Sequence, residues 1–162
     1  MSVTTDIVQA WRRPKAVMRR HMDRPKSEPF AFSLLVAFLV VAFVSLWPFL
    51  SRQTVLQPEV PMVQRLVAAG LALLALIPFW YLLAAISHWI AKALGGQCGH
   101  YAARLALFSA LLAVSPGLLL RGLVAGMIGP GAQLLLVDIL VGLCFAWIWM
   151  AMLREAERSY AG

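Results

Sequence analysis

The pattern of hydrophobic and polar positions divides this chain into a polar N-terminal segment, four long apolar runs and a short charged C-terminal end. The N-terminal segment covers residues 1–29, and the C-terminal end covers residues 154–162. Each apolar run reaches or exceeds the roughly 20 residues that carry a helix across about 30 Å of hydrocarbon. The pattern therefore predicts an all-α, polytopic transmembrane bundle of about four spans, at residues 30–50, 65–94, 102–126 and 132–153.

Prolines lie within or beside three of these runs. Pro78 and Pro116 lie inside the second and third runs, where each removes one backbone hydrogen bond and kinks its helix. A helical bundle tolerates such kinks because neighbouring helices cover the freed carbonyl. Pro48 follows the most apolar part of the first run, so we expect that span to leave the membrane there. A polar loop is then predicted at residues 51–64, which contain two further prolines.

Glycines mark the expected turns and close contacts between helices. Gly95 and Gly96 follow the second run, and we expect them to cap its helix and turn the chain into the third. Gly122 and Gly126 are four residues apart, a spacing that lets two helices approach closely. Gly142, four residues before an alanine, predicts a second contact of this kind in the last span.

Composition and charge support a membrane protein and predict its orientation. Hydrophobic residues make up 62% of the chain, charged residues 13%, and the mean hydropathy is +0.81, which excludes an ordinary soluble domain. Of the 14 Lys and Arg residues, seven precede residue 30. With four spans, eleven basic residues lie on the side of the two termini and three on the other. The termini are therefore predicted to be cytoplasmic. Scattered basic residues at helix ends give no reason to expect nucleic acid as a partner.

The N-terminal segment has two interpretations. A first short helix would place Trp11 on an apolar face, and Pro14 suits the first turn of a second helix. In one interpretation this segment is an amphipathic interfacial helix whose arginines bind anionic lipid headgroups. In the other it is a loosely ordered basic tail that only sets topology. The first interpretation assigns these residues to the membrane surface: Trp11, Arg12, Arg13, Arg19 and Arg20.

Few residues offer chemistry within the apolar runs. Asp138 is the one acidic residue inside a span, and Arg121 reaches a similar depth on the preceding span, so we expect the two to form an intramembrane pair. That pair is either a polar site for a proton, ion or headgroup or a structural contact. His88 has no histidine or carboxylate at ligand-like spacing, which favours a structural role. Cys98 and Cys144 lie at different depths and are predicted to be free thiols. No catalytic, cofactor-binding or metal-binding motif is recognisable.

The central hairpin resembles the Yip1 domain family of integral membrane proteins, in its bacterial branch. The resemblance rests on IPFWYLLAAISHWIAKAL at residues 77–94, the two glycines that follow, and RLALFSALLAVSP at residues 104–116. The preceding WRRPKAVMRR at residues 11–20 is similar to the amphipathic segment that often precedes such domains. The resemblance implies a small helical membrane bundle without known catalysis. Eukaryotic members associate with small GTPases, but this chain lacks their Asp-Leu-Tyr-Gly-Pro-type motif.

Three functions are compatible with these features. The first is a non-catalytic Yip1-like protein of the bacterial cytoplasmic membrane, which acts through contacts with lipids and proteins in membrane organisation. The second is a small ion or proton transporter or channel that uses Asp138. The third is an accessory or assembly subunit of a larger membrane complex, for which small-residue helix faces are suited. The expected partners are anionic lipids and either another membrane protein or further copies of this chain.

Overall fold

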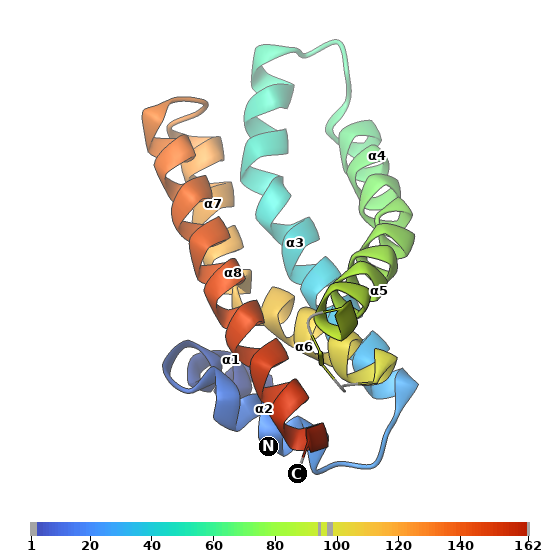
Figure 1. The fold of residues 1–162 in the computed structure, drawn as a ribbon. Coiled ribbons are helices and arrows are strands. Elements are labelled where there is room, and N and C mark those ends of the chain that lie inside the picture. Colours follow the sequence, from blue (N-terminus) through green and yellow to red (C-terminus); the bar gives the residue numbers. More distant parts are fainter. Residues whose placement is uncertain (1–2, 94, 97–98, 162) are drawn as a thin grey trace.

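The protein is helical throughout the part that a computed structural model describes, which is residues 3–93, 95–96 and 99–161. Within these ranges there is no strand. Figure 1 shows the helices as a bundle with two short N-terminal helices packed at one end. In chain order they are α1 Val3–Arg12, α2 Pro14–Met22, α3 Glu28–Leu56, α4 Met62–Ala75, α5 Ile77–Ala93, α6 His100–Ala113, α7 Ser115–Met127 and α8 Ala132–Ala161.

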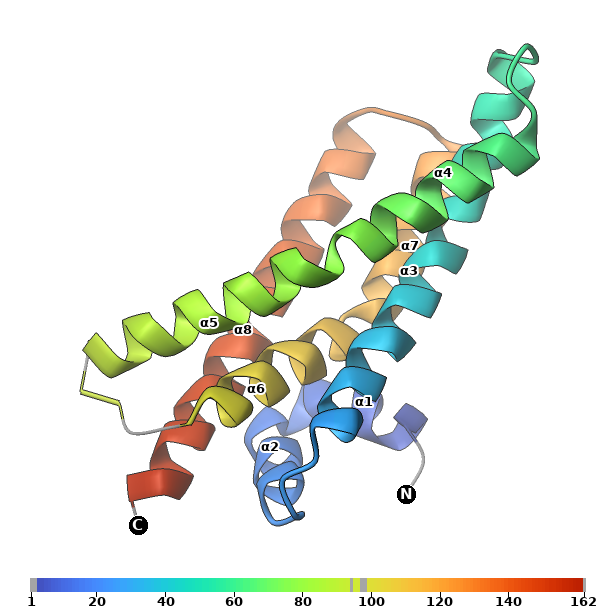
Figure 2. The ribbon, with the colours of Figure 1, turned by 90° about the vertical axis from the view of Figure 1, so that its right-hand side faces the viewer.

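The helical membrane bundle predicted from the sequence is confirmed. Three segments of the described chain are long and apolar enough to cross a membrane: α3, the α4–α5 pair and α8. A fourth span is present if α6 and α7, which meet at a bend of 43°, count as one broken span. Both ends of the chain lie at the same end of the bundle (Figures 1 and 2). Their cytoplasmic location stays a prediction.

Helix α3 does not end near Pro48, so the loop predicted at residues 51–64 is wrong over residues 51–56. Helix α3 continues through Pro48 to Leu56, and the connection to α4 is correspondingly short. The proline is accommodated because α7 packs against it through a glycine. A Cβ added to Gly126 would lie only 2.4 Å from the Cβ of Pro48. Bundle packing thus stabilises a proline-containing helix that the proline alone would end.

Pro78 and Pro116 break their helices, as the sequence predicts. Pro78 lies in the first turn of α5, directly after the break that separates it from α4. Pro116 lies in the first turn of α7 and cannot donate to the carbonyl of Leu112. The hydroxyl of Ser115 donates to that carbonyl instead, at 2.7 Å.

Helix α6 forms the centre of the core. Every residue from Ala102 to Val114 except Arg104 is buried. Helices α3, α5 and α8 surround it, and α1 and α2 also contact it. Figure 2 shows α6 running beneath α5, between α8 and α3. The N-terminal helices therefore cover one side of the most buried helix of the bundle.

The glycines behave as predicted at four of five positions. Gly95 has a φ of +89°, and the Gly96 N–H donates to the Ala91 carbonyl at 2.8 Å, which closes the end of α5. Gly122 and Gly126 bring α7 onto α3. The prediction for Gly142 is wrong. A Cβ there would meet nothing within 4 Å, because that face of α8 points away from the bundle.

Candidate functional site

The N-terminal helices lie against the bundle instead of forming a loose tail, so the second interpretation of this segment is wrong. Val17 and Met18 of α2 are buried in the core. The indole Nε1 of Trp11 donates to the Ala113 carbonyl at 2.7 Å, at the residue where α6 ends and the chain bends into α7. Because protein fills much of the apolar face, the part left for lipid contact is smaller than expected. Val8 and the partly exposed ring of Trp11 belong to that part.

Two of the arginines assigned to the membrane surface form ion pairs within the protein. Arg19 Nη2 lies 2.6 Å from Oε1 of Glu155, a buried carboxylate of α8 that raises the pKa of Arg19 through its hydrogen bond and charge. Arg20 lies 3.1 Å from Asp6 Oδ1 and 2.5 Å from Gln9 Oε1. These contacts tie α2 to α8 and to α1. The assignment of Arg19 and Arg20 to the membrane surface stays a prediction, and Arg19 remains 69% exposed beside its partner.

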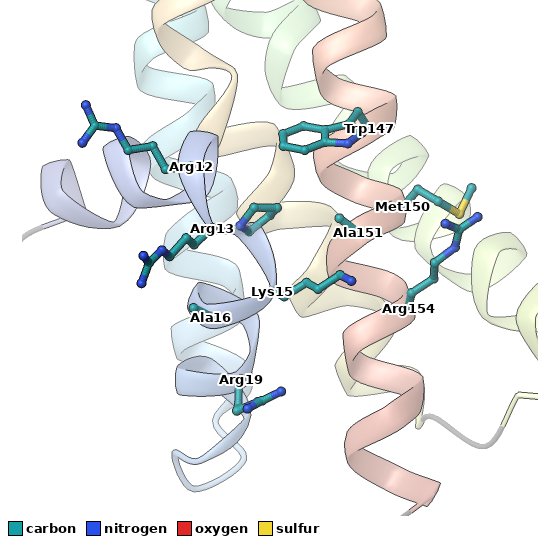
Figure 3. A pocket seen from close by; sticks show the side chains of 10 residues that line it. Arg12, Arg13, Lys15, Ala16, Arg19, Trp147, Met150, Ala151 and Arg154 are labelled. Carbon is teal, nitrogen blue, oxygen red and sulfur yellow. The ribbon is translucent and has the colours of Figure 1, made fainter.

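A basic cleft of about 620 Å³ separates the α1–α2 corner from α8. In Figure 3, Lys15 and Arg19 extend from α2 toward α8, whereas Arg12 and Arg13 extend outward. The cationic residues that line this basic cleft are Arg12, Arg13, Lys15, Arg19 and Arg154, and the α8 wall is Trp147, Met150, Ala151 and Arg154.

The residues that line the basic cleft include no carboxylate. Glu155 compensates the charge of Arg19, and the other four cationic residues leave the cleft positive. Guanidinium groups bind phosphate through paired hydrogen bonds, and an ammonium group adds a compact charge. Trp147 is exposed on the α8 wall, at the end of the span where tryptophan favours the membrane interface. The arrangement can therefore hold a phosphate-bearing group while its apolar wall contacts hydrocarbon.

His21 links the N-terminal helices to α6. Its side chain is buried, with Nδ1 at 3.3 Å from the hydroxyl of Ser109 and Nε2 at 3.7 Å from Oδ2 of Asp6. Burial lowers the pKa of His21, and the charges of Arg24 and Arg20 lower it further, whereas Asp6 opposes the change. The imidazole is therefore neutral in the packed state at pH 7.

The predicted pair between Arg121 and Asp138 is present. Arg121 Nε of α7 lies 2.5 Å from Asp138 Oδ1 of α8. Each side chain is 38% exposed, so the pair lies at the surface of the bundle and is not buried within the protein as expected. The two opposite charges neutralise each other and join the two helices near their connecting turn.

The expectation that His88 has no histidine neighbour is wrong. The rings of His88 and His100 lie with their centroids 3.8 Å apart, because the turn after α5 folds the start of α6 back under it. Among the described residues, no group of three His, Cys, Asp or Glu side chains could hold a metal ion. Cys144 is a free thiol, and Cys98 lies outside the described residues.

Sequence reasoning missed the role of Glu155. It stands among charged residues that resemble a solvated C-terminal end, yet only 3% of its surface is exposed. Its spacing carries a signal, since Ile148, Met152 and Glu155 recur at the interval of one helix face, and the first two are fully buried. A buried helix face that ends in a carboxylate predicts a basic partner packed against it.

A comparison with protein-family models matches the Yip1 domain over residues 8–160. The match spans nearly the whole chain, from the first turns of α1 to the end of α8. Neither the search of curated proteins nor the search of solved structures gave a match. Because the match covers nearly the whole chain, the chain belongs to the Yip1 domain family, and its apolar spans agree with this assignment.

Proposed function

We propose that this protein is a non-catalytic member of its family that organises the membrane through lipid and protein contacts. In this proposal the basic cleft binds anionic lipid headgroups. The observation that carries it is the grouping of five cationic side chains, from two separate parts of the chain, around one cavity. The cavity lies between α1, α2 and the C-terminal half of α8.

The physical basis is the attraction of phosphate for arginine and lysine at a membrane surface. Each basic residue near an anionic surface contributes about 1 kcal/mol to binding. Helices α1 and α2 are held in place by Trp11 and by the Arg19–Glu155 pair. Arg12, Arg13 and Lys15 therefore already line the basic cleft, and no disordered segment has to fold when a lipid binds. A preorganised cleft loses less conformational entropy on binding than a flexible basic tail.

Lipid retention by the purified protein tests this proposal. The protein is equilibrated with vesicles of phosphatidylglycerol and phosphatidylcholine that have matched acyl chains, extracted in mild detergent and analysed by native mass spectrometry. We expect phosphatidylglycerol to be preferred, and the double variant R12Q/K15Q to lower that preference about tenfold. The preference should also fall with rising salt.

A matched control is the double variant K92Q/R158Q. It removes the same two charges, and both side chains are exposed and lie outside the lining of the basic cleft. We expect it to keep the preference for phosphatidylglycerol. Equal losses in the two double variants would mean that net charge, and not the basic cleft, attracts the lipid, which would contradict the proposal.

The protein contacts in this proposal rest on a large exposed apolar surface. Ile139, Leu143 and Trp147 of α8 are more than half exposed, as are several residues of α4 and α5. Lipid covers such a surface in a membrane, and another membrane subunit or a further copy of the chain can replace the lipid. Purification in mild detergent with mass spectrometry of co-purifying proteins tests this. A constant stoichiometry identifies an accessory subunit, whereas a lone monomer leaves lipid binding as the function.

We also propose the bacterial cytoplasmic membrane as the location, with both termini in the cytoplasm. The bias of eleven basic residues to three supports this orientation. Reporter fusions at the two termini and at the turn after Met127 test it. We expect the termini to report the cytoplasm and the turn to report the opposite side; the reverse would exclude this orientation.

A further inference from the structure

A second cavity of about 620 Å³ lies on another side of α8, between that helix and α5. We call it the lateral groove. Its walls are mainly apolar, with Ile86 and Ile90 on α5 facing Leu153 on α8. Ile86 is 40% exposed and Ile90 57%, so the lateral groove opens to the side of the bundle, where hydrocarbon surrounds the spans.

One end of the lateral groove carries two opposite charges. Arg154 and Glu157 both line it, and they are three residues apart on α8, which places them on neighbouring positions of one helix face. The carboxylate of Glu157 lies against the turn after α5. A Cβ added to Gly96 would be 2.6 Å from Glu157 Oε2. The absence of a side chain at Gly96 thus leaves room for this carboxylate at the groove end.

The wall near these charges also contains an aromatic ring. Trp149 lines the lateral groove, and its Nε1 is buried and makes no hydrogen bond within the described part of the chain. Its ring is held by stacking on Phe145, with centroids 5.5 Å apart. Because this N–H is covered by protein, Trp149 contributes its ring to the apolar wall of the lateral groove.

We propose that the lateral groove binds a glycerophospholipid whose headgroup carries both a phosphate and a primary ammonium. The guanidinium of Arg154 binds the phosphate, the carboxylate of Glu157 accepts hydrogen bonds from the ammonium, and an acyl chain lies between Ile90 and Leu153. A quaternary choline headgroup has no N–H to donate, and a glycerol headgroup has no cation. The charge pattern therefore selects phosphatidylethanolamine, the simplest lipid of this class.

This site differs from the proposed anionic-lipid site in its chemistry. Arg154 and Met150 line both cavities, but the basic cleft has no carboxylate in its lining, whereas Glu157 lines the lateral groove. The two sites therefore predict different lipid preferences and different sensitive residues. Either proposal can fail while the other holds.

Competition between two zwitterionic lipids tests the lateral groove. The protein is equilibrated with vesicles that contain equal amounts of phosphatidylethanolamine and phosphatidylcholine with matched acyl chains, and the retained lipid is measured by native mass spectrometry. We expect phosphatidylethanolamine to exceed phosphatidylcholine about fivefold, since both headgroups carry a cation and they differ by the net value of one hydrogen bond, about 1 kcal/mol. The variant E157Q should bring the ratio close to one. Equal retention by the unmodified protein, or an unchanged ratio in E157Q, would overturn the proposal.

A steric variant keeps the test valid if E157Q alters the fold. Ile90→Trp fills the lateral groove from an exposed position, so retention of both lipids should fall at least threefold. Ile139→Trp is the matched control, since Ile139 is 53% exposed on a part of α8 outside the groove lining, and retention should not change. Equal effects of the two tryptophans would contradict the proposal. R12Q/K15Q should leave the ratio of phosphatidylethanolamine to phosphatidylcholine unchanged. A native mass equal to two copies of the chain without bound lipid would assign the groove to self-association and contradict the proposal.

Discussion

Gly122 and Gly142 show how differently two glycines with similar sequence context are used. A Cβ at Gly122 would lie 1.8 Å from the backbone oxygen of Ser45, whereas a Cβ at Gly142 would meet nothing within 4 Å. Each is followed four residues later by a small residue, so the spacing alone predicts two close helix contacts. The spacing shows that contact is sterically allowed. The path of α3 determines which of the two glycines packs against another helix.

We therefore expect Gly122→Ala to be strongly destabilising and Gly142→Ala to be tolerated. The added methyl at Gly122 forces α7 away from α3, and overpacking of this kind costs about 1–3 kcal/mol. Thermal unfolding in detergent measures the difference, with Gly142→Ala as the matched control. A loss of stability that is equal in the two variants would show that helix propensity, and not the contact with Ser45, governs the effect.

The buried imidazole of His21 makes docking of the N-terminal helices dependent on pH. Its pKa is lowered from 6.5 in the docked state, so the undocked segment binds a proton more readily. Docking is fully stable above about pH 6.5 and weakens as the pH falls below it, by at most about 1.4 kcal/mol per pH unit. We expect hydrogen exchange in α1 and α2 to rise between pH 7.5 and 5.5, corrected for the intrinsic rate. In His21→Gln this rise should be absent, and its persistence there would assign the effect to another group.

At the scale of elements, the bend between α6 and α7 joins three distant parts of the protein. Pro116 starts α7, Ser115 satisfies the Leu112 carbonyl, and Trp11 reaches the Ala113 carbonyl from the N-terminal helix. The proline itself is visible in the sequence and predicts the break. The acceptor for Trp11 is not, because residues 11 and 113 are brought together only by tertiary packing.

The hydrogen bond from Trp11 should determine how firmly α1 is held. Trp11→Phe keeps an aromatic ring but leaves the Ala113 carbonyl without its indole donor, a loss of about 1–3 kcal/mol for a buried acceptor. We expect faster proteolysis and hydrogen exchange in α1. Trp147→Phe is the control, since Trp147 is exposed on α8, and it should leave α1 unchanged. Unaltered exchange in Trp11→Phe would mean that packing alone holds the helix.

The Arg121–Asp138 pair should stabilise the contact between α7 and α8 without supporting transport. Asp138→Asn leaves Arg121 uncompensated beside hydrocarbon, whereas R121Q/D138N removes both charges. A double-mutant cycle of unfolding should give a favourable coupling of about 1 kcal/mol, as for other half-exposed pairs. Proton and ion flux in proteoliposomes should be the same for the protein and for Asp138→Asn. Flux that depends on Asp138 would favour a transporter instead.

At the scale of the whole molecule, the sequence predicted the class of fold and most of the spans, because their signal is local. Apolar runs, proline breaks and glycine turns depend on residues that are close in the chain. The candidate site was only partly predictable. Arg12 and Arg13 stand out in the N-terminal segment, but Trp147 and Arg154, which complete the basic cleft, come from the other end of the chain.

The lateral groove was not predictable from the sequence for the same reason. Ile86 and Ile90 look like ordinary lipid-facing residues of a span, and Arg154 and Glu157 look like a solvated helix end. Their relation appears only when α5 and α8 are placed on either side of one cavity. Amphipathic periodicity identifies a helix face but contains no information on which distant face it opposes.

The docking of α1 and α2 also has a consequence for the order of events during synthesis. These helices are translated before the bundle, yet Trp11 bonds to a residue 102 positions later, and Arg19 pairs with one 136 positions later. The contact of α1 with α6 can form once α6 is present, but docking is complete only after α8 has been translated through Glu155, and contacts of such long range form late in folding. Complete docking of the N-terminal segment thus requires that α8 is present. A nascent chain halted before Glu155 should expose Val17 and Met18 to proteases and chaperones, and a nascent chain extended beyond α8 should protect them.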